Sequence, residues 1–328
     1  MTDGGGMGVT FASLTSLGAA AAPQIAARAH ELGYTSFWVA ETTGPEAFSS
    51  LAAAGAAAPG IGLGTGVLAL QLRTPMVVAM AGATLQALHP DADIFLGVGI
   101  SSPVVVGRWH GATYGTRPVA QTREYVTLLK ECLSGESVSF KGDFYECSRF
   151  RLGVRLGEKR PQVVVGALNP AMLRTAGEVA DGVLLNYLPA SHVPWSVDQV
   201  RQGGDATIYA YVHVGVCERE HGIDAARRDL WSYAVVDSYA RNFERAGFAD
   251  DVAAIRERQK AGDRDGAVAA VSDAFVDAID IMGDEKQVRA AVQSYVDAGV
   301  EVPIIMPMPW GPDRRAVTDT TIAAAIGA

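Results

Sequence analysis

The chain has 328 residues, of which 49% are hydrophobic and 19% are charged, and its formal net charge is -9 at pH 7. This composition is typical of a globular protein with a large core, and the acidic balance argues against the clustered Lys and Arg of a nucleic-acid-binding surface. No apolar run reaches the ~18 residues that a membrane helix needs. We therefore expect a cytoplasmic protein with neither a nucleic-acid partner nor a membrane partner.

Cysteine and histidine residues show no pattern of a disulfide framework or of a metal site. Cys132, Cys147 and Cys217 are widely separated and form no C-x-x-C pair, which is typical of reduced thiols. The six histidines lack H-E-x-x-H or similar spacing, so we expect no metal. Residues 1–8 are rich in glycine and lack basic residues followed by an apolar core, which argues against a signal peptide.

The N-terminal half alternates short apolar strands with helices. Strands are predicted at 8–12, 36–40, 61–70 and 94–99, and helices at 19–32, 45–58, 75–88 and about 122–133. A polar turn and the Arg108-Trp109-His110-Gly111 segment lie between the fourth strand and the fourth helix. Residues 137–146 place Lys-Gly-Asp between alternating apolar residues, which predicts a short surface hairpin.

The C-terminal half continues the same alternation. Strands are predicted at 162–165, 182–185, 207–216 and 302–306, and helices at 171–179, 284–298 and 314–326, with Asp284 as an N-cap. Residues 222–280 are mostly helical and charged, which is more than one barrel helix needs. Eight strand–helix repeats predict a (β/α)8 TIM barrel. We assign one domain, 1–328, with the hairpin after the fourth helix and a helical insertion at about 222–280. Doubly wound sheets share this alternation.

In such a barrel the carboxyl ends of the strands carry the active site. This rule selects five groups of residues: 41–43, 66–71, 99–102, 166–169, and Asn186 with Tyr187. The turn at 166–169 opens a helix and could bind an anion through free backbone N–H groups, although an ordinary Asn169 N-cap followed by Pro170 fits as well. The glycine-rich segment 64–68 would let a flat ring approach the backbone, or is simply a crowded strand.

Several segments, in their order and spacing, resemble the luciferase-like monooxygenase superfamily, and within it the branch that uses the deazaflavin coenzyme F420. The resemblance runs from about Gly8 to Trp310. It is carried by the strand 95–99, Tyr114, Pro118, 123–125, Gly135 and the hairpin 138–144.

The resemblance implies a TIM barrel that binds coenzyme F420, with FMN as the alternative cofactor. It also implies a non-proline cis peptide bond between Gly66 and Val67. Relatives commonly pair as homodimers through barrel helices, so we expect a homodimer here. The strand ends and the resemblance together predict these cofactor-binding residues: Thr65, Gly66, Val67, Gly99, Ile100, Ser101, Ser102, Gly166, Ala167, Leu168, Asn169 and Asn186.

Glu41 is the predicted catalytic residue, because a carboxyl group in an apolar pocket at a strand end would serve as a proton donor or hydrogen-bond partner. A surface or helix-capping Glu is the alternative. Related deazaflavin-dependent sugar-phosphate dehydrogenases have Asp-His where this chain has Glu41-Thr42, and a Glu where it has Ser101-Ser102. These differences favour a more apolar small-molecule substrate.

We therefore expect an oxidoreductase that transfers hydride between coenzyme F420 and an unidentified organic substrate. Thr42, Trp109 and His110 would line the substrate pocket, whereas His213 is interpreted as a satisfied core histidine and Arg73 as structural. Two alternatives stay open: an FMN-dependent monooxygenase that uses O2, and a non-catalytic flavin-binding barrel protein.

Overall fold

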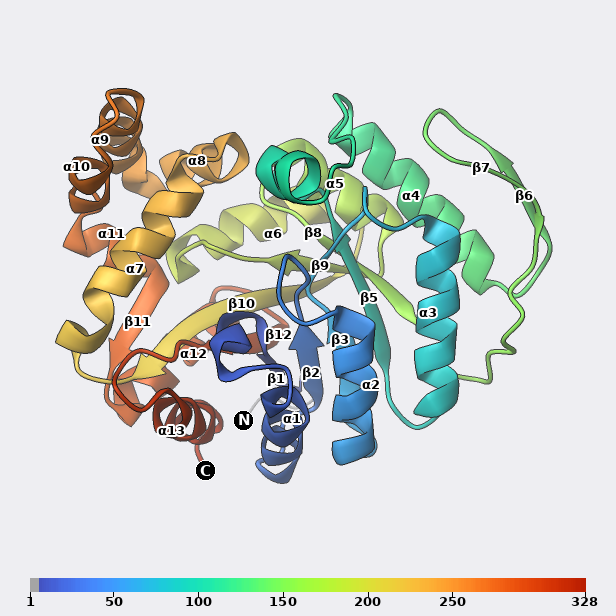
Figure 1. The fold of residues 1–328 in the computed structure, drawn as a ribbon, viewed down its shortest axis with the longest axis horizontal. Helices are drawn as coiled ribbons and strands as arrows, with labels where there is room; N and C mark the ends of the chain where they lie inside the picture. The colour runs from blue at the N-terminus through green and yellow to red at the C-terminus, as the bar shows by residue number, and fades with distance from the viewer. Residues whose placement is uncertain (1–5) are drawn as a thin grey trace.

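A closed ring of parallel strands lies at the centre of the molecule, as the computed structural model shows for residues 6–328 (Figure 1). This arrangement confirms the predicted TIM barrel. The prediction for residues 1–8 falls largely on residues 1–5, which lie outside the described residues. In order around the ring, the strands are β1 (Gly8–Thr10), β2 (Ser36–Val39), β3 (Gly62–Thr65), β5 (Ile94–Gly99), β8 (Gln162–Gly166), β9 (Gly182–Leu185), β10 (Thr207–Val216) and β12 (Val302–Pro307).

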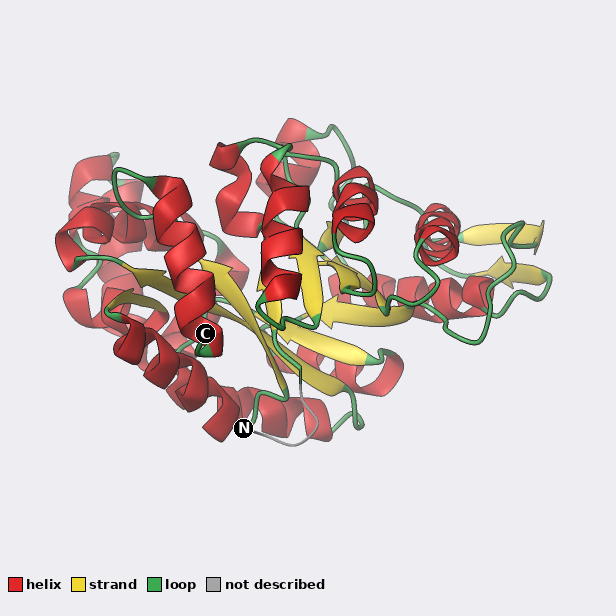
Figure 2. Ribbon diagram, turned by 90° about the horizontal axis from the view of Figure 1, so that it is seen from below, coloured by secondary structure: helices red, strands yellow, loops and turns green. Residues whose placement is uncertain are grey.

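The ring closes because β12 pairs with β1 and β10 pairs with both β9 and β12. Helices cross from each strand to the next and cover the outside of the ring (Figure 2). Their bounds agree with most of the predicted helices, including the Asp284 N-cap. They are α1 (Ala21–Glu31), α2 (Ala47–Ala57), α3 (Pro75–Leu88), α4 (Pro118–Leu133), α5 (Pro170–Val179), α6 (Val193–Arg201), α12 (Glu285–Asp297) and α13 (Arg314–Ile326).

Two insertions leave the barrel where the sequence predicts them. The hairpin of β6 (Val138–Lys141) and β7 (Glu146–Phe150) follows α4 and projects from the body of the molecule (Figure 2). Residues 219–283, called here the helical excursion, lie between β10 and α12. The excursion consists of α7 (Arg219–Ala234), α8 (Asp237–Phe243), the turn η4 (Glu244–Phe248), α9 (Ala249–Lys260), α10 (Arg264–Ala269), α11 (Asp273–Ile279) and the strand β11 (Asp280–Gly283).

The structure departs from the sequence-based elements at several places. The strand predicted at 8–12 ends at Thr10, and a helical turn, Ala12–Leu17, follows it. The continuous strand predicted at 61–70 is instead β3 and a two-residue β4 (Leu68–Ala69), separated by Gly66 and Val67. The helical turn at Val104–Trp109, the helix α6 and the strand β11 were not expected. Each of these three is short, and a short segment carries too few periods to reveal its type.

Aromatic side chains fill the inside of the barrel. Trp38 stacks on Phe95 with ring centroids 5.0 Å apart, and Tyr209 packs against both rings. Gly64 lies beside this layer, and a Cβ atom there would lie 2.4 Å from the Trp38 ring. A glycine is therefore required on β3 because an indole ring occupies the neighbouring space.

Residues 6–328 are the described residues, and their helices are of ordinary length. None of their helices has the length and apolar character that a transmembrane span requires. The cytoplasmic location, the absence of a nucleic-acid partner and the assignment of 1–328 to one domain stay predictions.

Gly97→Ala is expected to destabilise the barrel by about 1–3 kcal/mol, since overpacking a core has this cost. The added Cβ would lie 1.9 Å from the backbone oxygen of Thr65, so the backbone must shift. Gly153→Ala is the control, because nothing lies within 4 Å of its Cβ position. Urea unfolding measures both, and equal midpoints for the two variants would contradict the expectation.

Candidate active site

The predicted site residues gather at one end of the barrel, here called the mouth, because all barrel strands are parallel and end on the same side. Glu41 follows β2, and Gly66 and Val67 follow β3. The segments 100–102 and 167–169 follow β5 and β8, and Asn186 follows β9. The structure thus brings them together, whereas their binding roles stay predictions.

Gly66 and Val67 form the floor of the mouth. The peptide bond between them is cis, as the family resemblance implies. The Gly66 carbonyl oxygen accepts a 2.8 Å hydrogen bond from the hydroxyl group of Tyr211, which is buried inside the barrel. Added Cβ atoms at Gly99 and Gly166 would lie 2.9 Å and 3.3 Å from the Val67 side chain. These two glycines therefore make room for Val67.

Thr65 supports this floor from below. Its side chain is fully buried, and its Oγ1 donates to the carbonyl oxygen of Gly97 at 2.8 Å. The hydroxyl group is thus satisfied within the protein, so any contact of Thr65 with a ligand would be made by its backbone.

The loop after β5 forms one side of the mouth. Ser101 has a φ of 51°, a left-handed conformation that non-glycine residues seldom adopt. Ser102 accepts a hydrogen bond from the Val105 backbone N–H at 3.2 Å, and Gln71 donates to the Ile100 carbonyl oxygen at 3.0 Å. Gln71, the last residue of the candidate group 66–71, thus holds the loop in place.

The turn 166–169 has a cationic partner that the sequence analysis missed. Asn169 begins α5, yet its side chain makes no capping hydrogen bond. Its Oδ1 instead accepts a 2.7 Å hydrogen bond from Arg245 of the helical excursion, which also donates to the Leu168 carbonyl oxygen at 3.3 Å. Ala167 is buried, and its N–H donates to the Leu184 carbonyl oxygen.

Arg245 brings positive charge to the start of α5. Burial, followed by the charge of Arg241, lowers the pKa of Arg245, and its buried Nε has no hydrogen-bond partner among the described residues. Neither arginine forms an ion pair within residues 6–328. The charge of Glu244 opposes the lowering of the Arg245 pKa. A helix N-terminus with a nearby guanidinium group that forms no ion pair is suited to an anion such as phosphate.

Glu41 lies at the mouth, but not in the apolar surroundings on which its predicted role as a proton donor was based. Arg73 donates to both carboxylate oxygens, from Nε to Oε1 at 3.1 Å and from Nη2 to Oε2 at 3.0 Å. The Ala47 backbone N–H, in the first turn of α2, adds a third bond at 3.0 Å. Arg73 thus holds both carboxylate oxygens of Glu41, and it has a structural contact, as expected.

The three residues predicted to line the substrate pocket come from two loops. His110 Nε2 lies 2.6 Å from the carbonyl oxygen of Thr42, so the loops after β2 and β5 are in contact. Trp109, beside His110, is 57% exposed. An exposed indole ring next to the mouth could contact an apolar ligand.

Asn186 and His213 are also in contact. His213 is 1% exposed, and its two ring nitrogens lie 2.9 Å from Asn186 Oδ1 and from Asp280 Oδ1. The expectation of a buried, satisfied histidine is confirmed. Its carboxylate partner Asp280 was not foreseen, because β11 was not predicted.

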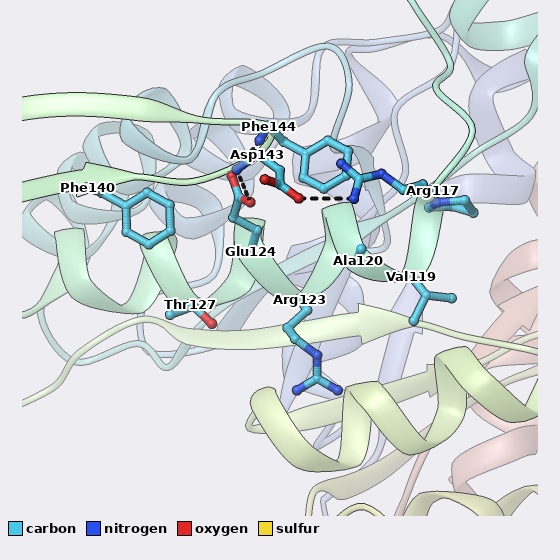
Figure 3. A pocket seen from close by; sticks show the side chains of 10 residues that line it. Arg117, Val119, Ala120, Arg123, Glu124, Thr127, Phe140, Asp143 and Phe144 are labelled. Atoms are coloured by element: carbon cyan, nitrogen blue, oxygen red, sulfur yellow. Dashed lines mark hydrogen bonds and ion pairs between the residues drawn. The ribbon is translucent and has the colours of Figure 1, made fainter.

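A cleft of about 710 Å³ lies elsewhere, between α4 and the β6–β7 hairpin (Figure 3). Its charged side chains all have partners: Arg117 pairs with Asp143 at 3.0 Å, Arg123 pairs with Glu178 outside the cleft, and the Glu124 carboxylate accepts the backbone N–H groups of Asp143 and Phe144. This cleft contains none of the predicted site residues, and its polar contacts hold the hairpin on the barrel.

Comparison with known proteins gives one family and several relatives. The model of the family described as luciferase-like monooxygenase matches residues 7–301. A Mycobacterium tuberculosis protein, provisionally named a coenzyme F420-dependent oxidoreductase, is 27% identical over 315 residues, which cover 86% of this chain and 89% of the relative. The 5,10-methylenetetrahydromethanopterin reductase of Archaeoglobus fulgidus is 28% identical over 272 residues, covering 78% and 79%.

Among solved structures, the coenzyme F420-dependent tetrahydromethanopterin reductase of Methanopyrus kandleri superposes with a TM-score of 0.81 at 20% identity. The match covers 98% of this chain and 99% of that chain. At this level of identity the similarity concerns the fold.

Glu41→Gln is expected to lower the free energy of unfolding by about 1–2 kcal/mol, because it removes the charge from a two-point ion pair that is mostly buried. Glu31→Gln is the control, since Glu31 pairs with Arg28 on the exposed surface and such pairs contribute about 0–1 kcal/mol. Thermal and urea unfolding measure both variants. If Glu41→Gln and Glu31→Gln lowered the free energy of unfolding equally, the Glu41–Arg73 pair would not be structural.

Proposed function

This chain belongs to the luciferase-like monooxygenase family, and we propose that it is an oxidoreductase that transfers hydride between coenzyme F420 and an organic substrate. Two observations support this cofactor. A relative that covers most of the chain is named for coenzyme F420, and the mouth combines the glycine-containing segment Gly66 and Val67 with a cationic turn at the start of α5. The second observation carries the proposal, because coenzyme F420 combines a planar ring, which the floor would face, with an anionic tail, which the cationic turn would bind.

The residues present fit such a group. Gly66 and Val67 would lie under the ring, and Ile100, Ser101 and Ser102 would border it. The turn 166–169 would hold the phosphate through the N–H groups of α5, and Arg245 is a countercharge whose buried Nε lacks a partner. When bound, coenzyme F420 supplies a hydride carrier with little reactivity toward oxygen.

The substrate would be bound beside the ring by Thr42, Trp109 and His110. We propose that Glu41 faces this pocket and acts as a hydrogen-bond acceptor whose position is fixed by Arg73 and by the start of α2. A fixed acceptor orients a hydroxyl or amine group of the substrate. The exposed Trp109 favours a substrate with an apolar portion.

Two other functions would use the same mouth. FMN also carries a phosphate on a tricyclic ring, so an FMN-dependent monooxygenase is a second candidate. A non-catalytic flavin-binding protein is a third, and the ion-paired state of Glu41 favours it. Tight FMN binding with oxygen consumption would support the second candidate, and coenzyme F420 binding without turnover on any compound of a broad substrate panel would support the third.

Arg245→Gln is expected to weaken coenzyme F420 binding about tenfold, since a buried charge-assisted contact is worth at least 1.4 kcal/mol. Arg228→Gln removes a charge from an exposed position of α7 and is the control. Asn169→Asp should weaken binding as well, because the new carboxylate would neutralise Arg245. Fluorescence titration measures all four proteins. Wild-type affinity in Arg245→Gln would remove this arginine from the phosphate site.

We also propose that the protein forms a homodimer through α3. Val77, Met80 and Leu88 on this helix are 45%, 53% and 59% exposed, and a row of exposed apolar side chains is typical of an interaction surface. Light scattering should give twice the monomer mass for the wild type and the monomer mass for Met80→Glu. A monomeric wild type would contradict this proposal.

A further inference from the structure

A buried row of three polar side chains leads from β11 to the mouth. Asp280 on β11 and His213 on β10 are each 1% exposed, and their contact joins Oδ1 to Nδ1 at 2.9 Å. The other ring nitrogen of His213, Nε2, lies 2.9 Å from Oδ1 of the half-buried Asn186. Asp280 Oδ2 is buried without a partner among the described residues, so His213 is the polar contact of this carboxylate.

The hydrogen bonds define the orientation of the Asn186 carboxamide. The backbone N–H of Tyr187 donates to Asn186 Oδ1 at 2.8 Å, so this atom is the oxygen and not the nitrogen. Nε2 of His213 faces the same oxygen and must therefore carry a proton. The amide nitrogen Nδ2 makes no hydrogen bond to another described residue and is not buried, so it is a free donor.

Tyr187 is itself held from several sides. Its φ is 51°, its hydroxyl group donates to Asp229 Oδ2 at 2.8 Å, and its carbonyl oxygen accepts from Asn242 at 2.9 Å. Its ring packs edge-on against His213 with centroids 4.6 Å apart. Burial, followed by the charge of Asp280, raises the pKa of Asp229 to about 6, while the hydrogen bond from Tyr187 opposes this shift. The helical excursion thus fixes the N–H group that orients Asn186.

This free donor lies where a bound ring would be. Tyr211 and His213 point to the same side of β10, because side chains alternate along a strand, and Tyr211 contacts the floor at Gly66. His213 is therefore one layer nearer the mouth. Asn186 follows β9. It comes two residues after Leu184, which pairs with Gly166 at the start of the turn 166–169. Asn186 thus lies next to the turn 166–169, on the following strand around the ring.

We propose that Asn186 donates a hydrogen bond from Nδ2 to a carbonyl oxygen of the deazaflavin ring, and that His213 and Asp280 are positioning residues that hold its carboxamide in this orientation. The proposal rests on the proposed function. A preorganised donor selects a ligand with an acceptor oxygen at that point, because a ligand without one leaves the donor unpaired.

Asn186→Asp tests the donor, since it keeps Oδ1 for His213 and Tyr187 but replaces the N–H donor with an oxygen. The probes are coenzyme F420 and the same deazaflavin ring with its ribityl chain but no phosphate tail. We expect about tenfold weaker binding of both probes, the effect of one lost hydrogen bond with an unpaired acceptor. Binding of the tail-less ring separates this effect from repulsion of the phosphate.

Two double variants test the positioning role. His213→Gln with Asp280→Asn keeps a donor near the place of Nε2, whereas His213→Leu with Asp280→Asn removes it, and both lack the buried charges. The Gln variant should bind the tail-less ring about as tightly as the wild type, and the Leu variant about fivefold or more weakly. Nitrogen-15 NMR of the ligand-free wild type should show a proton on His213 Nε2.

The outcomes separate the two proposals. A wild type that binds neither probe would contradict the proposed function and this inference with it. Binding by the wild type with unchanged affinity in Asn186→Asp would overturn the donor role alone. Equal affinities in the Gln and Leu variants, or a His213 protonated only on Nδ1, would overturn the positioning role.

Discussion

The hydrogen bond from Tyr211 to the carbonyl oxygen of Gly66 joins two opposite parts of the barrel. Both groups are buried, and a buried polar group without a partner costs about 1–3 kcal/mol. The junction of β3 and β4 is therefore tied to β10 across the interior. His213 follows Tyr211 by two residues on β10. The same strand therefore carries both the tyrosine that contacts Gly66 and the histidine that contacts Asn186 one layer nearer the mouth.

Long periodic elements were predicted closely from the sequence. α3 and α13 begin and end at the predicted residues, since Pro75 and Asp313 mark their starts and their apolar faces extend over several turns. Short elements were missed. β11 has only four residues and begins with a charged side chain, so neither its period nor its hydrophobicity distinguishes it from a loop.

The candidate site was also predicted only in part. The rule that barrel strands carry their active site at the carboxyl end selected backbone segments such as 166–169 and the side chain of Asn186, because this information is local. It missed Arg245, which contacts Asn169 across 76 residues of chain, and Asp280, which contacts His213 across 67. For Glu41 the position was predicted, but its partner Arg73, which donates to both carboxylate oxygens, was not.

The helical excursion contacts the mouth through Arg245 at the turn 166–169, through Asp229 and Asn242 at Tyr187, and through Asp280 at His213. A segment that looks like an appendage in the sequence thus completes the rim of the barrel. The proposed anion site at Asn169 and the orientation of Asn186 therefore both depend on residues of this one insertion. Exchanging this insertion between related barrels would therefore replace the partners of Asn169 and His213 together. Substitutions confined to the barrel strands would leave both partners in place.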